Sequence, residues 1–268
     1  MTTLHCLADM DAGTGFTPEF GLSLFLETDG CRILFDTGAG AALLPNATRM
    51  NLELGTLTDI VVSHGHYDHT GGLAGFRPGP DVPVWTGPDV AAQCWSQHDD
   101  GTKRRLTMPR AAQEVLVQCD VHTVASFQEI RPGVFLTGPI PRESGEDCGG
   151  RFFSDEACTE PNPVQEEISL LLRSGVLITG CCHAGIINSV ESCRKAHPEI
   201  RIRTIAGGLH LSHADPARLE QTADYLDSLG LERMIPMHCT GADAVQFLRR
   251  RLSCPVDALP VGHGMRLD

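Results

Sequence analysis

The chain has 268 residues, of which 41% are hydrophobic and 5% aromatic, enough for one large core or two closely merged layers. Its 34 acidic and 21 basic residues give a net charge of −13, which argues against binding to nucleic acid or to an anionic membrane surface. The opening residues lack a basic stretch followed by an apolar run, and no later run reaches membrane-helix length, so we expect a soluble cytoplasmic protein.

The 11 cysteines are an odd number, and their spacing contains no C-x-x-C pair and no even framework of the kind seen in small secreted domains. We therefore expect reduced thiols. Most of them, such as Cys94 and Cys193, are expected to be small buried apolar residues.

The first half of the chain begins with strands and then loosens. Residues 21–36 predict two strands around Asp29-Gly30, a dipeptide that favours a tight hairpin turn. Residues 59–64, DIVVSH, predict a strand buried on both faces, which ends where a histidine-rich turn begins. From about 86 to 165 the sequence is rich in Gly, Pro and charge, which is typical of functional covers or mobile segments. We expect a single domain spanning 1–268 with a substrate-covering insertion at about 86–165.

Regular alternation returns in the second half. Strands are predicted at 168–173, 176–180 and 201–206, with a helix from about 185. The stretch SHADPARLEQTADYLDSLG predicts a helix capped by Asp215, with Pro216 in its first turn and Gly230 at its end. A strand at 233–238, a helix from 240 to about 252 and a strand near 261–267 follow. This order indicates a layered α/β protein, although periodicity alone does not choose its topology.

The stretch SHGHYDHTGG, residues 63–72, concentrates metal-binding side chains behind a strand. The imidazoles of His64, His66 and His69 and the carboxylate of Asp68 form a mixture that zinc, iron and manganese accept. Residues two apart on a tight turn can point to one side, while Asp68 and His69 face another. One turn can therefore serve two neighbouring ions, and a merely solvated polar turn is the weaker explanation.

These residues resemble the H-x-H-x-D-H motif of the metallo-β-lactamase superfamily, including the glycine pair after the last histidine. ILFDTG, TGPIPRE, ITGCCHAGIINSV, AGGLHL and IPMHCTG resemble the branch related to 7,8-dihydropterin-6-yl-methyl-4-(ribofuranosyl)aminobenzene-5'-phosphate synthase, over roughly residues 20–245. The resemblance implies a four-layer αββα sandwich with a dinuclear metal site at the shared edge of its sheets.

Carried over position by position, the resemblance implies ligands for two ions. The first ion is bound by His64 and His66. The second ion is bound by Asp68, His69 and His238. His263 in VGHGM is an alternative to His238, because a GHG sequence closes the site in some related proteins. The implied cofactors are two divalent transition metal ions, zinc first, with iron or manganese as alternatives.

The sequence departs from the family pattern in two places. The position of the family's bridging aspartate reads Cys181, so that the thiolate of Cys181, the imidazole of His183, or both can be ligands, whereas Cys182 is expected to point into the core. The family's third histidine is replaced by Glu166 and Glu167, which we expect to solvate a turn rather than bind metal. An oxygen-richer site would favour iron or manganese over zinc.

Two further residues receive roles from their places at strand ends. Asp36, which ends ILFDTG, resembles the residue that supports the histidine turn from behind by accepting an imidazole N–H. His210, in AGGLHL, is expected to be a catalytic proton donor or oxyanion contact, with packing as the alternative. We also expect Asp68 to act in catalysis besides binding metal.

Two ions a few ångströms apart lower the pKa of a bridging water and hold the attacking and leaving oxygens, which makes hydrolysis the simplest chemistry. Lys103, Arg104, Arg105 and Arg110 cluster in the loose segment, and Arg142 lies in TGPIPRE. We expect Arg104, Arg105 and Arg142 to bind a small phosphorylated substrate, a phosphoester, a phosphodiester or a pterin-related compound, although a charged loop can be merely solvated.

Alternative functions are a lactone or thioester hydrolase, an iron-dependent redox enzyme, and a non-catalytic metal-binding regulatory protein. The expected partner is a small-molecule substrate, with no nucleic acid and no membrane, and the formation of a homo-oligomer stays open.

Overall fold

The computed structural model describes residues 1–146, 148 and 150–267, and the chain divides into two compact units. Unit 1 comprises Met1–Thr123, Gly150–Glu166 and Leu259–Asp268, and unit 2 comprises Val124–Gly149 and Glu167–Ala258. The loose segment at 86–165 therefore contributes to both units. Among the described residues, every helix is too short or too polar to cross a bilayer.

The main sheet of unit 1 has seven strands in the order β16-β1-β2-β3-β4-β5-β8. Their bounds are β1 Thr2–Ala8, β2 Ser23–Thr28, β3 Cys31–Phe35, β4 Asp59–Val62, β5 Pro83–Thr86, β8 Asp120–Thr123 and β16 Gly264–Arg266. The strands from β16 to β3 pair antiparallel, whereas β3, β4, β5 and β8 pair parallel. The sheet therefore changes from hairpin to parallel pairing at β3, next to the strand that leads into the histidine turn.

Two local predictions for unit 1 are confirmed. Strands β2 and β3 form the expected hairpin, and Asp29 and Gly30 take the positive φ angles (42° and 82°) that a tight hairpin turn requires. All four residues of β4 are buried, because this strand lies between two parallel neighbours in the sheet.

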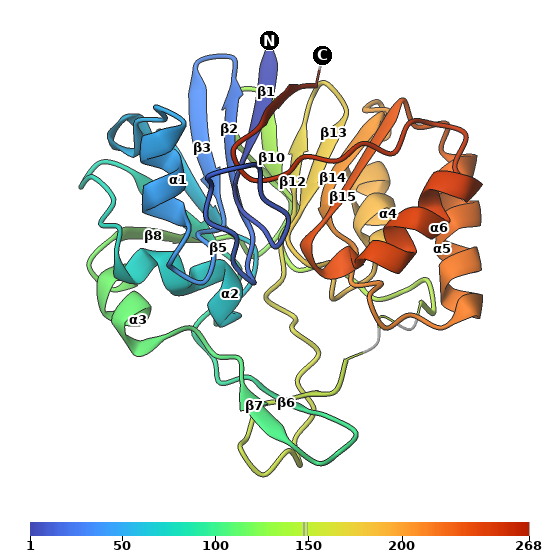
Figure 1. Ribbon diagram of the computed structural model, residues 1–268, viewed down its shortest axis with the longest axis horizontal. Helices are drawn as coiled ribbons and strands as arrows, with labels where there is room; N and C mark the ends of the chain where they lie inside the picture. Colours follow the sequence, from blue (N-terminus) through green and yellow to red (C-terminus); the bar gives the residue numbers. More distant parts are fainter. Residues whose placement is uncertain (147, 149, 268) are drawn as a thin grey trace. The chain divides into compact units, whose positions relative to one another are not determined.

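Three α-helices and a small second sheet complete unit 1 (Figure 1). The helices are α1 Leu43–Arg49, α2 Tyr67–Thr70 and α3 Arg110–Leu116, with 3-10 turns η1 Leu54–Thr56 and η2 Gly71–Ala74. The second sheet has the order β11-β6-β7, with β6 Trp95–Gln97, β7 Lys103–Arg105 and β11 Phe152–Phe153. A core that includes Phe25, Leu34 and Ile60 packs against Ala112 and Leu116 of α3.

Unit 2 has a six-stranded sheet in the order β15-β14-β13-β12-β10-β9. The strands are β9 Gln128–Arg131, β10 Val134–Leu136, β12 Leu170–Leu172, β13 Val176–Thr179, β14 Thr204–Gly208 and β15 Arg233–Met237. The helices are α4 Ile186–Ala196, α5 Pro216–Ser228 and α6 Ala242–Arg251, and η3 His238–Thr240 follows β15. Figure 1 shows these helices beside β13, β14 and β15, which pair parallel.

The second half of the chain follows the sequence pattern closely, with one displaced strand. Helix α5 begins as predicted, with Pro216 in the first turn and the Asp215 Oδ1 accepting a 2.8 Å hydrogen bond from the Arg218 backbone N–H. The strand expected at 201–206 instead spans Thr204–Gly208. Its partner β13 starts only after Gly175, so parallel pairing cannot begin before Thr204.

Candidate metal centre

The four donor residues of the histidine turn are buried where β4 ends. His64 and His69 are fully buried, and His66 and Asp68 are only 4% and 6% exposed. The ring centroid of His64 lies 4.6 Å from that of His66 and 4.2 Å from that of His69, and the His69 Nε2 is 3.8 Å from the Asp68 Oδ2. Unit 1 therefore brings together the four donors that the sequence singled out, in the close spacing that a metal site requires.

Asp36 lies at the centre of a buried hydrogen-bond network beneath these rings. The His69 Nδ1 donates to the Asp36 Oδ2 over 2.7 Å, and the Ser63 hydroxyl donates to the same oxygen, also over 2.7 Å. The Ser63 Oγ is in turn 2.9 Å from the His64 Nδ1 and accepts its proton. Both rings are thereby held as Nδ1–H tautomers, whose lone pair lies on Nε2, the arrangement typical of metal-binding histidines.

The backbone of the turn is held from several sides. The Tyr67 N–H donates to the Leu106 carbonyl over 2.7 Å, and the Thr37 N–H donates to the His69 carbonyl over 2.7 Å. A side chain at Gly65 would lie 2.0 Å from the Val90 carbonyl oxygen, so only glycine fits between the two histidines. The His66 ring is fixed by the Cys94 Sγ, which lies 3.2 Å from its Nε2. Cys94 is therefore buried as expected, but it also contacts the turn.

Unit 2 collects its donor side chains at the carboxyl ends of three parallel strands. Cys181 and His183 follow β13, His210 follows β14, and His238 and Cys239 follow β15. Neighbouring parallel strands end at the same edge of a sheet, so these side chains meet. The donor atoms of Cys181, His183 and His210 lie within 4.8 Å of one another, as do those of Cys181, His238 and Cys239.

The strand ends of unit 2 adopt an unusual backbone. Cys182, His210 and His238 have φ angles of 58°, 50° and 50°, in the left-handed region that non-glycine residues rarely occupy. Cys182 points into the hydrophobic core, as predicted, and is only 1% exposed. Hydrogen bonds involving Cys181 and His210 and the charge of nearby histidines lower the pKa of Cys239 well below that of an ordinary thiol, although burial raises it.

The two glutamates at the position of the family's third histidine differ from the expectation of a solvated turn. Glu167 is 1% exposed, and its two oxygens accept the backbone N–H groups of His183 (2.7 Å) and Ala184 (2.8 Å). Burial raises the pKa of Glu167 to about 7, although these hydrogen bonds oppose the rise. Glu166 is half-buried, and its Oε1 accepts the Gly65 N–H over 3.3 Å. Each glutamate thus supports a donor-bearing turn, because the turns expose N–H groups that need acceptors.

The predicted substrate-binding cations do not form one cluster. The Arg104 side chain lies over the Tyr67 ring at 4.9 Å and donates to its hydroxyl. The Lys103 Nζ donates to the Ala157 carbonyl, and Arg110 pairs with Glu114 on α3. Side chains alternate along β7, so Arg104 points to one face of the strand and its neighbour Arg105 to the other. Arg104 is therefore the basic residue of this segment that contacts the histidine turn.

Two more residues that the sequence singled out are exposed. Arg142 is an exposed residue of unit 2, and its positive charge acts on Glu167 and on Glu146. His263 is exposed, its backbone carbonyl accepts the Cys6 N–H, and it belongs to none of the donor groups found among the described residues. Within the described part of the chain, the donor groups therefore include His238 but not His263, the alternative metal ligand.

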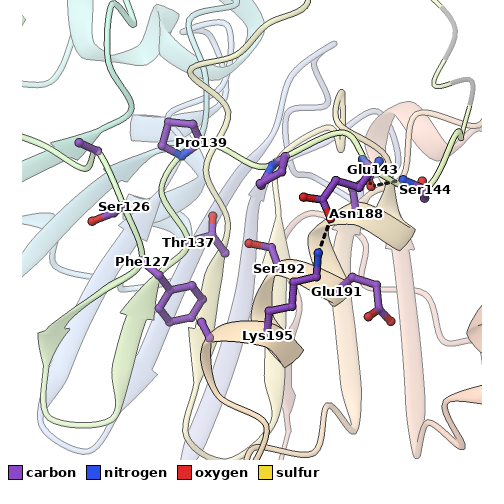
Figure 2. Close-up of a pocket in the computed structure, with 13 residues that line it drawn as sticks. Ser126, Phe127, Thr137, Pro139, Glu143, Ser144, Asn188, Glu191, Ser192 and Lys195 are labelled. Atoms are coloured by element: carbon purple, nitrogen blue, oxygen red, sulfur yellow. Dashed lines mark hydrogen bonds and ion pairs between the residues drawn. The ribbon is translucent and has the colours of Figure 1, made fainter.

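A cavity of about 630 Å³ lies elsewhere in unit 2, beside α4 (Figure 2). Asn188 and Lys195 of the helix face it, and Lys195 pairs with the Glu143 carboxylate. The Asn188 Oδ1 accepts the backbone N–H groups of Glu143 and Ser144, both over 2.8 Å. Within the described part of the chain, no donor of the metal groups lines this cavity.

Comparison with known proteins identifies the family of this arrangement. The sequence model of the Metallo-beta-lactamase superfamily matches residues 16–238, a range that runs from before the histidine turn to His238. The solved structure of Tm1679, described as a metal-dependent hydrolase of the beta-lactamase superfamily, matches with a TM-score of 0.87 and 29% identity. That match covers 100% of this chain and 99% of the other, and it confirms the fold expected from the sequence.

Two proteins of Methanocaldococcus jannaschii are also similar over most of their lengths. 7,8-dihydropterin-6-methyl-4-(beta-D-ribofuranosyl)-aminobenzene-5'-phosphate synthase is 28% identical over 260 residues, which cover 90% of this chain and 88% of the synthase. The uncharacterized protein MJ0448 is 30% identical over 246 residues, which cover 90% of this chain and 92% of MJ0448. The branch that the sequence motifs resemble is therefore confirmed.

Proposed function

Because this chain belongs to the metallo-β-lactamase superfamily, we propose that it is a metal-dependent hydrolase of a small phosphorylated molecule. The observation that carries the proposal is the network in which Asp36 and Ser63 hold the rings of His64 and His69 as Nδ1–H tautomers. The similarity to Tm1679, which is described as a metal-dependent hydrolase, supports the reaction type. The 5'-phosphate in the name of the similar synthase supports a phosphorylated ligand.

The donor set fits divalent transition ions, because it combines oriented imidazoles, a carboxylate and thiols. The residues that we propose to hold two ions are those that the resemblance implies: His64, His66, Asp68, His69, Cys181, His183 and His238. Bound there, such ions lower the pKa of water and stabilise the negative charge that develops during hydrolysis.

The remaining steps are assigned to the chain's own side chains. Asp68 is almost buried beside His69, and we assign it to orient the attacking water by accepting one of its protons. His210 follows β14 beside His183, with ring centroids 4.6 Å apart, and we assign it to donate a proton to the leaving oxygen. Asp36 is fully buried, and its two oxygens are occupied by Ser63 and His69, so its role is to orient the rings.

Arg104 is assigned to bind the phosphate. Its guanidinium contacts the ring and the hydroxyl of Tyr67. Tyr67 lies between His66 and Asp68 in the chain, so this contact keeps Arg104 beside the histidine turn. A guanidinium can grip two phosphate oxygens at once, and a side chain that is already oriented loses less entropy when the substrate binds. Tyr67 therefore connects substrate binding to the metal-binding turn.

The test of the substrate class compares Arg104→Ala with Arg105→Ala, a neighbouring arginine on the opposite face of the same strand. Loss of one charge-assisted contact is worth roughly 1.5–3 kcal/mol, so Arg104→Ala should raise KM for the best phosphorylated substrate about 10- to 100-fold. The kcat should change little, and Arg105→Ala should behave like the unaltered protein. Equal KM values for both variants would reject phosphate binding by Arg104 and would favour an uncharged ester or lactone.

The test of metal dependence uses His66→Ala. Elemental analysis of the purified protein should show bound transition metal. His66→Ala should lose part of this metal, the part that the histidine turn holds, together with turnover of a panel of phosphoesters, lactones, thioesters and pterin-linked phosphates. Full turnover by metal-free protein would rule out the proposed reaction. Metal binding without turnover of any compound in the panel would favour the regulatory alternative.

A further inference from the structure

Unit 2 by itself gathers two thiols and three imidazoles at one edge of its sheet. Cys181 belongs to both groups of close donors, with His183 and His210 in one and with His238 and Cys239 in the other. Cys239 has no counterpart in the ligand set that the resemblance implies. Unit 2 therefore carries more potential metal ligands than its share of the proposed dinuclear centre requires.

The Sγ of Cys239 occupies a space that Gly208 leaves open. A side chain at Gly208 would lie 2.4 Å from the Gly180 carbonyl oxygen, 2.6 Å from this sulfur and 3.3 Å from the Cys181 Cα, so any larger residue at this position would press on both the backbone and the sulfur. The His210 backbone N–H donates to the Cys239 Sγ over 3.3 Å, and the thiol lies 3.5 Å from the Cys181 carbonyl. The sulfur is thereby held between the residues that follow β13 and β14.

The environment of Cys239 differs from that of a packing cysteine. Cys193 and Cys182 lie among the aliphatic side chains of the unit 2 core and are each 1% exposed. Cys239 is half-buried, and its neighbours are backbone polar groups and other donor side chains. Reactive or ligating thiols are found in such polar, partly accessible surroundings, whereas structural thiols are surrounded by carbon.

We propose that Cys239 is a metal ligand, and that Cys181, His238 and Cys239 together bind one zinc ion within unit 2. With zinc–sulfur and zinc–nitrogen bonds of about 2.3 Å and 2.0–2.1 Å, tetrahedral donors lie roughly 3.3–3.8 Å apart, so small torsional changes bring the three atoms from within 4.8 Å to bonding positions. Water or a neighbouring imidazole completes the four ligands. Both thiols lose their protons to solvent when the ion binds.

The ligand set has a consequence for metal identity. Thiolates are soft ligands that favour zinc over manganese, which prefers carboxylate and water oxygens. The oxygen-richer site considered from the sequence rested on Glu166 and Glu167, but both carboxylates bind backbone N–H groups. The ligand set of unit 2 therefore favours zinc over manganese, whichever reaction the protein catalyses.

The experiment is zinc K-edge X-ray absorption on the full-length protein loaded with zinc. The unaltered protein should show a sulfur shell at about 2.3 Å with two sulfur neighbours for the ion in unit 2. Cys239→His should keep the zinc content but remove one sulfur neighbour, and Cys239→Ser should lower zinc affinity by 10-fold or more. Cys254→Ser, which alters a half-buried thiol of unit 2 outside the donor groups, is the matched control and should change neither quantity.

Two further variants test the geometry and separate this inference from the proposed function. Gly208→Ala keeps both thiols but should weaken zinc binding, because the added methyl group presses on the Gly180 carbonyl oxygen and on the Cys239 sulfur. His66→Ala should lose turnover but retain the sulfur-bound zinc ion. An unchanged sulfur count in Cys239→His, or loss of all sulfur-bound zinc in His66→Ala, would overturn the inference. A protein that keeps its sulfur shell but hydrolyses nothing would refute only the proposed function.

Discussion

Asp36→Asn is the most informative single substitution, because it changes one atom in the network beneath the histidine turn. Asparagine tolerates the left-handed backbone of this position (φ 58°), and its amide oxygen can still accept the Ser63 N–H now bound by Oδ1. The amide NH₂ would replace the oxygen that accepts the His69 Nδ1–H. His69 would then have to accept at Nδ1 and carry its proton on Nε2, so that its metal-binding lone pair is lost.

The size of the effect follows from the geometry. The contact between the His69 Nδ1 and the Asp36 Oδ2 is 2.7 Å long and fully buried, which is typical of a strong charge-assisted hydrogen bond. Removal of such a bond costs roughly 1.5–3 kcal/mol. Loss of the residue that orients a metal-binding histidine lowers metal affinity about 10- to 100-fold. These two estimates agree, because each 10-fold change corresponds to about 1.4 kcal/mol.

The assay is competition for zinc with a chromogenic chelator, together with ¹⁵N detection of the histidine tautomers. One class of bound metal should weaken by the stated factor, and the His69 signal should change from the Nδ1–H to the Nε2–H tautomer. Asp59→Asn is the control, because Asp59 is equally buried in β4 but accepts a hydrogen bond from the Trp85 indole. Unchanged metal affinity in Asp36→Asn, with a folded protein, would refute the role given to Asp36.

Two predictions concern stability in unit 2. Arg218 is 7% exposed, and its positive charge acts on the buried Glu146. Arg218→Met leaves the Glu146 carboxylate buried without this charge, so it should lower the free energy of unfolding by roughly 3–5 kcal/mol, measured by denaturant titration; a stabilised variant would contradict this. Burial raises the pKa of Glu146, although the charge of Arg218 opposes the rise. Glu146 therefore contributes stability below the ordinary glutamate pKa, and this contribution is lost as the pH rises through the pKa of Glu146 in the folded protein. Tm should fall less steeply with rising pH in Glu146→Gln than in the unaltered protein, over the range between the ordinary and the folded-state pKa of Glu146. The same pH dependence of Tm in both proteins would contradict this prediction.

Sequence reasoning succeeded where the signal is local. The Asp29-Gly30 turn, the apolar run of β4 and the Asp215 cap of α5 each specify their structure through residues that are adjacent in the chain. The histidine turn was recognisable for the same reason, because its four donors lie within six positions. Such elements need no knowledge of their distant neighbours.

Features that depend on distant partners were missed. Lys103–Arg105 forms strand β7 although all three residues are exposed, because it pairs with β6 and not because of any apolar pattern. Glu167 was expected to be a surface residue, yet it is buried and accepts hydrogen bonds from backbone N–H groups 16 and 17 residues further along the chain. Cys239 lies in the stretch IPMHCTG, but its proximity to Cys181 could not be foreseen, because Cys181 follows a strand two places away in the sheet. No local pattern of residues indicates these contacts.

Backbone strain gathers at the same places as the donor side chains. Of the nine described non-glycine residues with positive φ, four belong to or adjoin donor side chains within their own unit: Asp36 in unit 1, and Cys182, His210 and His238 in unit 2. Left-handed backbone costs on the order of 1–3 kcal/mol for each such residue, and folding alone does not require it at the ends of three parallel strands. A ligand that binds only the folded protein stabilises it in proportion to the logarithm of its concentration. The strained strand ends are therefore expected to be most stable with metal bound, and Tm should rise with zinc concentration in the unaltered protein more steeply than in Cys239→Ser.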